Sequence, residues 1–189
     1  MQPYQYSPLR KDHNEIRLIR LLPGPTSAEI EIEIFHRKRS AKYEALSYVW
    51  GPPKRTDIAL VSKPAISPKP LSQLFARLRT GSRPRTTLGI THNLAIALYH
   101  LRHSKKSRVL WIDAICINQD DDVERSAEVL EMGSIYARAK QVIVWLGPSS
   151  EDSRLAIITL SRLGEGCSYD FQTGAVYLLH REWFSRLWV

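Results

Sequence analysis

Two runs rich in apolar residues lie in the first part of the chain, separated by a break rich in Pro and Gly, and the second of them alternates strictly between apolar and polar residues. The first run, "IRLIRLL", begins at Ile16, and the second, "EIEIEIF", places Ile30, Ile32 and Ile34 between glutamates. A period of two is typical of a strand with one buried face. The break "PGPTSA" is typical of a turn between paired strands. The pattern predicts an N-terminal β-hairpin over residues 15–38.

Three later runs are apolar at odd and even positions alike: "YEALSYVWG", "VLWI" and "QVIVWLG". Strands buried on both faces have this pattern in parallel sheets that helices cover. A helix is predicted after Thr91, which is placed to cap it, because Leu94, Leu98 and Leu101 recur at helical spacing. The alternation of strands and helices predicts an α/β fold with a mostly parallel sheet and flanking helices, preceded by the hairpin.

A second helix is predicted to open at Asp121 and to run to about Arg138. Asp121 and Glu124 have the spacing of a capping box, in which each side chain accepts a hydrogen bond from the backbone of the other end of the turn. The helix has two apolar stripes, so it is expected to pack on more than one side. These stripes are Val123, Ala127, Leu130 and Ala137, and Val129, Met132 and Tyr136.

The 189 residues are expected to form one domain. Residues 63–87 are rich in Pro, Ser and Arg and are expected to form a surface insertion, with a short helix around "LSQLFARLR". Two helices are predicted over the last forty residues or so, and the chain stops at Val189 within an apolar pattern, so the natural domain is expected to continue. There is neither an apolar run of membrane-spanning length nor a signal-peptide pattern, which predicts a cytoplasmic protein.

Charge is distributed in blocks along a chain whose formal net charge is +8. Residues 51–108 contain twelve Lys or Arg and one acid, whereas residues 113–131 contain seven acids and one Arg. Such blocks could neutralise each other in the fold. Because the basic aromatic patterns of nucleic-acid-binding modules are absent, nucleic-acid binding is not favoured, and a solvated basic face accounts for the charge.

The run "LWIDAICINQDDDVERS" changes from an apolar strand to an acidic segment, and this change marks the candidate site. Ligands of open parallel α/β sheets bind beyond the carboxyl ends of the strands, where loops and helix N-termini converge. The sequence therefore predicts a site for a polar ligand at this edge. The candidate residues are Ser47, Trp50, Asp113, Asn118, Gln119, Glu124 and Arg125. The alternative is structural: Asp113 binds backbone amides of the turn after its strand, while Asn118 and the acids of residues 120–122 cap the next helix.

Common catalytic and metal-binding signatures are missing. The sequence has no G-x-S-x-G, Walker A, H-E-x-x-H or G-x-G-x-x-G motif, and its two cysteines lack the spacing of a zinc site. We therefore predict no metal and no resident cofactor. Cys116 and Cys167 are expected to be buried thiols.

The three blocks "YEALSYVWG", "LWIDAICINQDDDVERSAEVLEMGSIYARAKQVIVWLG" and "REWFSRLWV" resemble those of the fungal heterokaryon incompatibility (HET) domain, from about Tyr43 to Val189. The resemblance implies a cytosolic protein of nonself recognition that triggers programmed cell death through protein partners or self-association. The element order is also similar to that of Toll/interleukin-1 receptor (TIR) domains, which have a flavodoxin-like fold.

Some TIR domains cleave NAD with a glutamate on a helix that corresponds by position to the segment after "RLWV". The resemblance thus implies NAD as a possible substrate and an NAD glycohydrolase as the alternative function. The chain ends before the Gln-Glu pair that HET domains carry there, so Asp113 and Glu124 are the carboxylates left as candidates.

Overall fold

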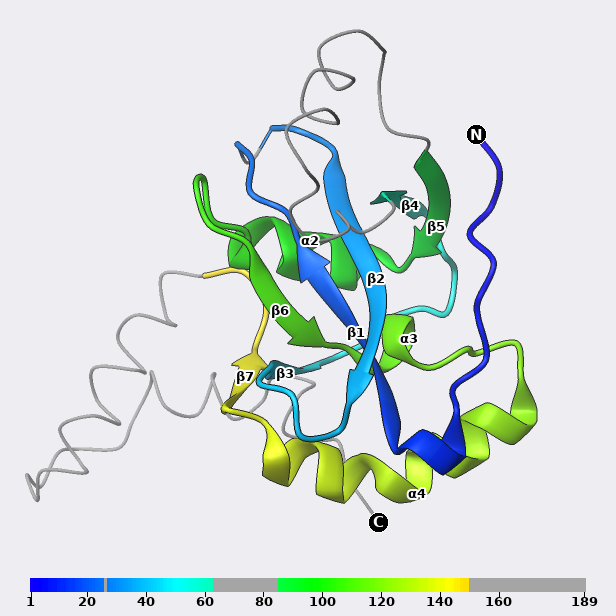
Figure 1. Cartoon of the computed structure of the whole chain (residues 1–189). Helices are drawn as coiled ribbons and strands as arrows, with labels where there is room; N and C mark the ends of the chain where they lie inside the picture. The colour runs from blue at the N-terminus through cyan, green and yellow to red at the C-terminus, as the bar shows by residue number, and fades with distance from the viewer. Residues whose placement is uncertain (26, 63–84, 150–189) are drawn as a thin grey trace, which may run out of the picture.

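The computed structural model describes residues 1–25, 27–62 and 85–149 of the chain, and within them one seven-stranded sheet (Figure 1). The order of the strands across the sheet is β5-β4-β2-β1-β6-β3-β7. The strands are β1 (Glu15–Leu21), β2 (Ile30–Lys38), β3 (Glu44–Tyr48), β4 (Asp57–Ser62), β5 (Arg85–Ile90), β6 (Arg108–Trp111) and β7 (Gln141–Trp145). The helices are the short 3-10 helix η1 (Lys11–His13), α2 (His92–Leu101), α3 (Asp113–Cys116) and α4 (Asp122–Arg138).

The predicted hairpin is confirmed, since β1 and β2 pair in antiparallel fashion from Glu15↔Lys38 to Leu21↔Ile32. The hairpin does not precede the sheet, however; it forms the middle of the sheet. β1 pairs with β6 through Ile19↔Leu110, and β2 pairs with β4 through Ile32↔Val61. The isoleucines and leucines of both strands are therefore buried in the main core.

The expectation of a mostly parallel sheet is not confirmed, because the sheet is mixed. β6-β3-β7 are parallel to one another, as predicted, and β2 is parallel to β4. The pairs β1–β2, β1–β6 and β4–β5 are antiparallel. The sequence pattern therefore identified the three parallel strands correctly, but β4 and β5 were missed.

The boundary of the expected insertion also needs correction. Residues 85–87 are the start of β5, which pairs with β4 from Ser62↔Arg85 to Asp57↔Ile90. Thr86, Thr87 and Ile90 are β-branched and could have indicated a strand. The rest of the insertion, its expected helix and the two expected C-terminal helices lie outside the described residues.

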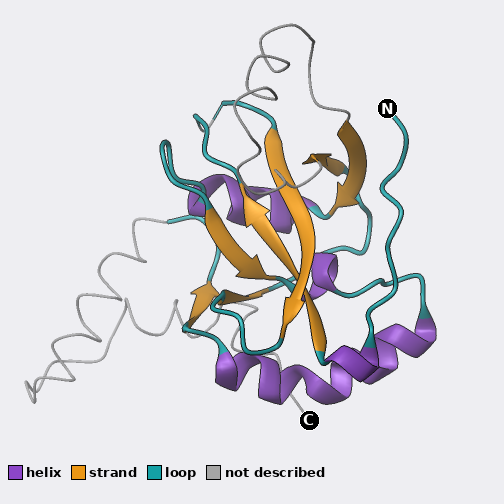
Figure 2. Ribbon diagram, viewed as in Figure 1, coloured by secondary structure: helices purple, strands orange, loops and turns teal. Residues whose placement is uncertain are grey.

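The strands β6, β3 and β7 form the parallel part of the sheet, and the helices α2 and α4 cover its two faces (Figure 2). Side chains alternate between the two faces of a sheet, and the register places Trp111 and Trp145 on opposite faces. Trp111 meets Tyr136 of α4 edge to face, with ring centres 5.5 Å apart, whereas Trp145 lies 4.9 Å from the ring of His100 in α2. The crossover helices thus pack as predicted for an α/β unit.

Both predicted helices are present, with their predicted N-caps. The Thr91 hydroxyl accepts a hydrogen bond from the Leu94 amide, and the Asp121 carboxylate accepts from the amides of Val123 and Glu124. The return bond of the capping box does not form, because the Asp121 amide donates to the carbonyl of Asn118.

The predicted packing of α4 is wrong for its first apolar stripe. Its buried residues are Glu124, Glu128 and Ile135, whereas Val123 and Leu130 of the first apolar stripe are exposed. The glutamates are buried because they pair with arginines of the hairpin region: Arg17 binds Glu124 and Arg39 binds Glu128. Met132 and Tyr136 of the second stripe are partly buried and pack against the core. Pairing with these arginines therefore determines which side of the helix faces inward.

Candidate functional site

The carboxyl ends of β3 and β6 lie side by side, because these strands are parallel neighbours through Glu44↔Leu110 and Ala45↔Trp111. Each strand is followed within two residues by a candidate side chain. The indole N–H of Trp50, after β3, donates to Oδ2 of Asp113, after β6, at 2.9 Å. The structure thus brings together the two loops from which the sequence predicted a site.

Asp113 is 5% exposed and holds the turn that follows β6. Its other carboxylate oxygen, Oδ1, accepts from the amide of Ala114 at 2.8 Å, at the start of α3. The side-chain amide of Gln119 donates to the Asp113 carbonyl at 2.9 Å and thereby closes the same turn. The Asp113 carboxylate therefore binds a backbone amide of the turn, as the structural alternative predicted. It also binds the indole of Trp50, which that alternative did not include.

Two hollows flank this hydrogen-bonded turn, and both are lined by Trp50, Gln119 and Arg125. The first, of about 250 Å³, extends over Arg55 and the start of α2. The second, of about 330 Å³, extends over Asp113 and the apolar side chains of α4. We call the two hollows together the strand-end cleft. Its remaining lining residues are Pro53, Gly89, Ile90, Thr91, Leu94 and Ala114 in the first hollow and Ile117, Val129 and Met132 in the second.

Positive charge lines the strand-end cleft at two arginines. Arg125 donates to the Gln119 carbonyl at 2.8 Å and pairs with Asp122 at 2.7 Å, and its side chain remains 45% exposed. Arg55 lies 3.7 Å from Asp120, and both side chains are largely exposed. An indole, a carboxamide and two guanidinium groups together suit a ligand that has a flat ring and an anionic group.

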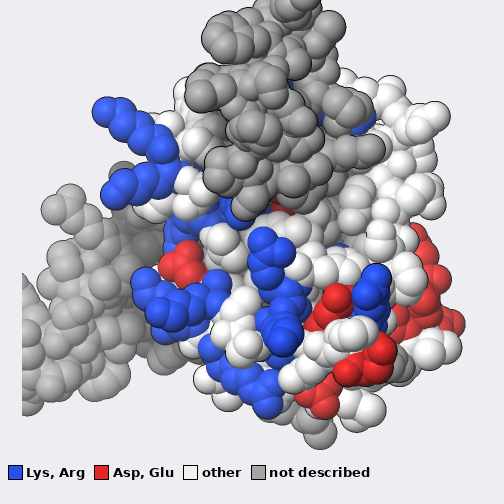
Figure 3. All heavy atoms as spheres, in the orientation of Figure 1, with Lys and Arg blue, Asp and Glu red and all other residues white. Residues whose placement is uncertain are grey.

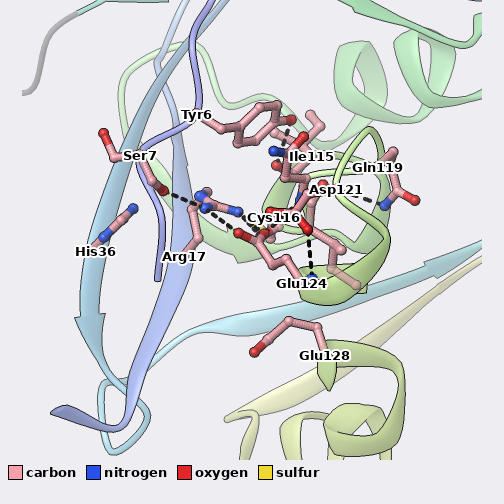
Figure 4. Close-up of polar contacts among 12 residues, drawn as sticks. Tyr6, Ser7, Arg17, His36, Ile115, Cys116, Gln119, Asp121, Glu124 and Glu128 are labelled. Atoms are coloured by element: carbon pink, nitrogen blue, oxygen red, sulfur yellow. Dashed lines mark hydrogen bonds and ion pairs between the residues drawn. The ribbon is translucent and has the colours of Figure 1, made fainter. Parts of the chain in front are cut away.

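Glu124 was predicted at the cleft, but its carboxylate is buried on the other side of the turn (Figure 4). Its Oε1 lies 2.6 Å from Nη1 of Arg17, its Oε2 lies 3.2 Å from Nη2, and Oε1 also accepts from the Asn118 amide at 2.7 Å. Asn118 takes part through its backbone, while its side-chain oxygen accepts from the Asp120 amide. Ser47 is buried within β3 and is not among the residues that line the two hollows.

Arg17 is the residue that the sequence reading missed. Its side chain is fully buried in β1 and also donates to the carbonyls of Cys116 at 2.8 Å and Ser7 at 2.7 Å, beneath the ring of Tyr6. Burial alone would lower the pKa of Arg17, but the hydrogen bond and charge of Glu124 hold this pKa above its usual range. The available signal was an arginine in the middle of the apolar run "IRLIRLL", where a buried charge requires a partner.

The other titratable groups around Arg17 are unsuited to nucleophilic chemistry. Burial raises the pKa of the Cys116 thiol to about 12, so it stays protonated at neutral pH. Burial also raises the pKa of the Tyr6 hydroxyl, which donates to the Ile115 carbonyl at 3.1 Å. The hydrogen bonds of Arg17 and Glu124 therefore hold the loop 113–121 on its buried side. The strand-end cleft lies on the other side of this loop, which is open to solvent.

Among the described residues, the acidic and basic blocks make little contact with each other. The acids of α4 pair mainly with Arg17 and Arg39, and among the described residues Arg55–Asp120 is the link to the basic block. Acidic and basic side chains accordingly gather in different areas of the face shown in Figure 3, with the acids over the region of α4. The described residues contain no group of three or more potential metal ligands, and none of their helices has the length and hydrophobicity of a membrane span.

Comparison with known proteins assigns the family. The model of the heterokaryon incompatibility protein (HET) family matches residues 43–189. Heterokaryon incompatibility protein 6, OR allele, of Neurospora crassa is 40% identical over 123 residues, which are 65% of this chain and 17% of that protein. The chain thus spans a small part of this relative. No solved structure matches the chain. The matched region contains β3, α3, α4 and β7, and the chain belongs to the heterokaryon incompatibility (HET) family.

Proposed function

We propose that this chain is a signalling module of fungal nonself recognition that acts in the cytoplasm and triggers programmed cell death. The observation that carries the proposal is the family match over residues 43–189, together with a relative that is named for heterokaryon incompatibility. Death would follow when cells of incompatible type fuse and the module is engaged by protein partners or by its own copies.

The local architecture supports a TIR-like way of signalling. β6, β3 and β7 are parallel and have helices on both faces. Trp50 and Asp113, which belong to two of the HET-like blocks, meet at the carboxyl ends of β3 and β6. In such sheets this edge is where ligands and partners bind, because loops converge there. The strand-end cleft is thus the natural input site of the proposed module.

Induced expression of the chain in a fungal host tests the proposal. We expect colony survival to fall after induction, and we expect Trp50→Ala to restore survival because the indole lines both hollows. Asp120→Ala is the matched control, since this side chain is 78% exposed and lines neither hollow. Circular dichroism of the purified variants verifies folding. Full survival with abundant folded wild-type chain would refute the proposal.

NAD cleavage is the second candidate, and the strand-end cleft is the observation that favours it. Trp50 could stack on a base or on nicotinamide, and Arg55 and Arg125 could bind phosphates. In the reaction the bond between ribose and nicotinamide breaks, the oxygen of water bonds to the ribose carbon, nicotinamide leaves and one proton is released. A carboxylate has to stabilise the oxocarbenium-like transition state.

The carboxylates of the described residues at this edge already have partners, which limits the second candidate. Glu124 is bound by Arg17, so Asp113 is the carboxylate that reaches the cleft, and it would do so while bonded to Trp50. We expect nicotinamide release from NAD to be measurable by chromatography if the candidate is correct. Asp113→Asn keeps the shape of the side chain and would abolish turnover. No nicotinamide release by the folded wild-type chain would remove this candidate and leave the signalling proposal untouched.

A further inference from the structure

The outward face of α4 has the composition of a helix interface. Glu128 and Ile135, which are seven residues apart, are buried against the sheet. The positions on the opposite side of the helix repeat in a heptad pattern and are apolar or small: Val123, Ser126, Leu130, Gly133 and Ala137. We call these five residues the α4 stripe.

The large side chains of the α4 stripe extend into solvent. Val123 is 73% exposed and Leu130 is 87% exposed, and they stand two turns apart on the same face. A Cβ placed on Gly133 would meet no atom within 4 Å. Next to Leu130 the helix surface therefore has a gap, with backbone accessible beside an exposed leucine.

Charge is polarised along the same helix. Asp120, Asp121 and Asp122 lie at its N-terminal end, whereas Arg138 and Lys140 lie at its C-terminal end. Two such helices that run antiparallel would place each acidic end beside a basic end. Antiparallel packing also pairs the positive end of one helix dipole with the negative end of the other. Parallel packing would bring like charges together.

We propose that the α4 stripe is a homodimer interface, in which α4 packs antiparallel against α4 of a second copy of this chain. The heptad register places Leu130 against Gly133 of the partner subunit, so that the leucine fills the gap left by the glycine. It also places Asp122 beside Lys140 of the partner subunit. Small residues at the contact let the two helix axes approach to about 8 Å.

The proposed interface is small, so we expect low dimer affinity, and the assay has to cover a wide range of protein concentrations. α4 has 17 residues and is therefore about 25 Å long. One helix face buries less surface than the ~1,200–2,000 Å² of stable complexes, so the dimer is expected to be weak and reversible. The inference concerns association of the chain itself, so it can be tested without any cell-death readout.

Sedimentation velocity of the purified chain, from about 5 to about 500 µM, tests the proposal. We expect the mass to rise from monomer to dimer with concentration. Leu130→Glu should raise the dissociation constant at least about tenfold, because it places a charge in the centre of the contact. Ile58→Glu is the matched control, since Ile58 is an exposed apolar residue of β4, and it should dimerise like wild type.

Charge reversal tests the antiparallel register. Asp122→Lys and Lys140→Glu should each weaken dimerisation, and the double variant should restore it, because each lysine then faces a glutamate. The proposal is overturned if the wild-type chain stays monomeric, or if Leu130→Glu leaves dimerisation unchanged. It is also overturned if the double charge-reversal variant fails to restore dimerisation. Resistance of the Leu130→Cys variant to thiol labelling in dilute monomer would also overturn the proposal, because residues of the same chain would then cover the stripe.

Discussion

The buried arginine of β1 provides the sharpest test of how the fold is held together. In Arg17→Met the aliphatic part of the side chain is kept and the guanidinium is removed. The Glu124 carboxylate then remains buried without its cationic partner, and the carbonyls of Ser7 and Cys116 lose a donor. The loop that carries the strand-end cleft loses its main connection to the hairpin.

The expected cost follows from the environment of the pair. Arg17 is fully buried and Glu124 nearly so, so solvent screening is weak. Removing one partner of a buried ion pair typically costs about 3–5 kcal/mol, because the other charge is left uncompensated. That is a large share of the ~5–15 kcal/mol by which native proteins are stable. With a urea slope of roughly 2 kcal/mol per M, the unfolding midpoint should fall by about 2 M.

A double-mutant cycle separates the ion pair from general damage to the core. Urea unfolding is followed by circular dichroism for the wild type, Arg17→Met, Glu124→Leu and the double variant. The double variant should be more stable than the sum of the single effects predicts by at least about 2 kcal/mol, because it leaves no unpaired charge. A loss below about 1 kcal/mol for Arg17→Met, or strictly additive losses, would refute the reasoning.

Four further predictions concern single positions. Gly51 has φ +70°, and a Cβ there would lie 2.6 Å from Nδ2 of the Asn93 side chain, so Gly51→Ala should lower the melting temperature. Gly133→Ala should raise it in dilute protein, with a gain of about 0.5–1 kcal/mol. Asp121→Ala should cost about 1 kcal/mol in urea unfolding, whereas Asp121→Asn keeps the cap. Burial raises the pKa of Glu128 in the folded protein, so protonation of this carboxyl stabilises the fold. The stability advantage of wild type over Glu128→Gln should therefore be largest below pH ~4.3 and should decline as pH rises through the raised pKa. An advantage that grows with pH would contradict this prediction.

Local patterns predicted the parts of the fold that local physics determines. The hairpin, the three parallel strands, both long helices and their caps were predicted because periodicity and capping depend on neighbouring residues. β5 was missed because its first residues follow a Pro- and Arg-rich segment, and the placement of the hairpin was missed because pairing between β1 and β6 joins residues about ninety positions apart.

The candidate site was predicted in part, for a similar reason. Trp50, Asp113, Gln119 and Arg125 meet because two adjacent parallel strands end at one edge, which the pattern of strands implies. Glu124 was assigned to the wrong side of the turn, since its place depends on Arg17, which is 107 residues away in the sequence. The same pairing of buried charges explains why Val123 and Leu130 of α4 face outward.

Survival of fungal cells after induced expression of this chain tests the central claim most directly. Colonies are counted over time, the folded protein is quantified in the same cultures, and Trp50→Ala and Asp120→Ala are induced in parallel. A fall in survival with the wild type and Asp120→Ala, and its absence with Trp50→Ala, is the predicted result. Undiminished survival in cells that accumulate the folded wild-type chain would contradict the claim that this HET module triggers cell death.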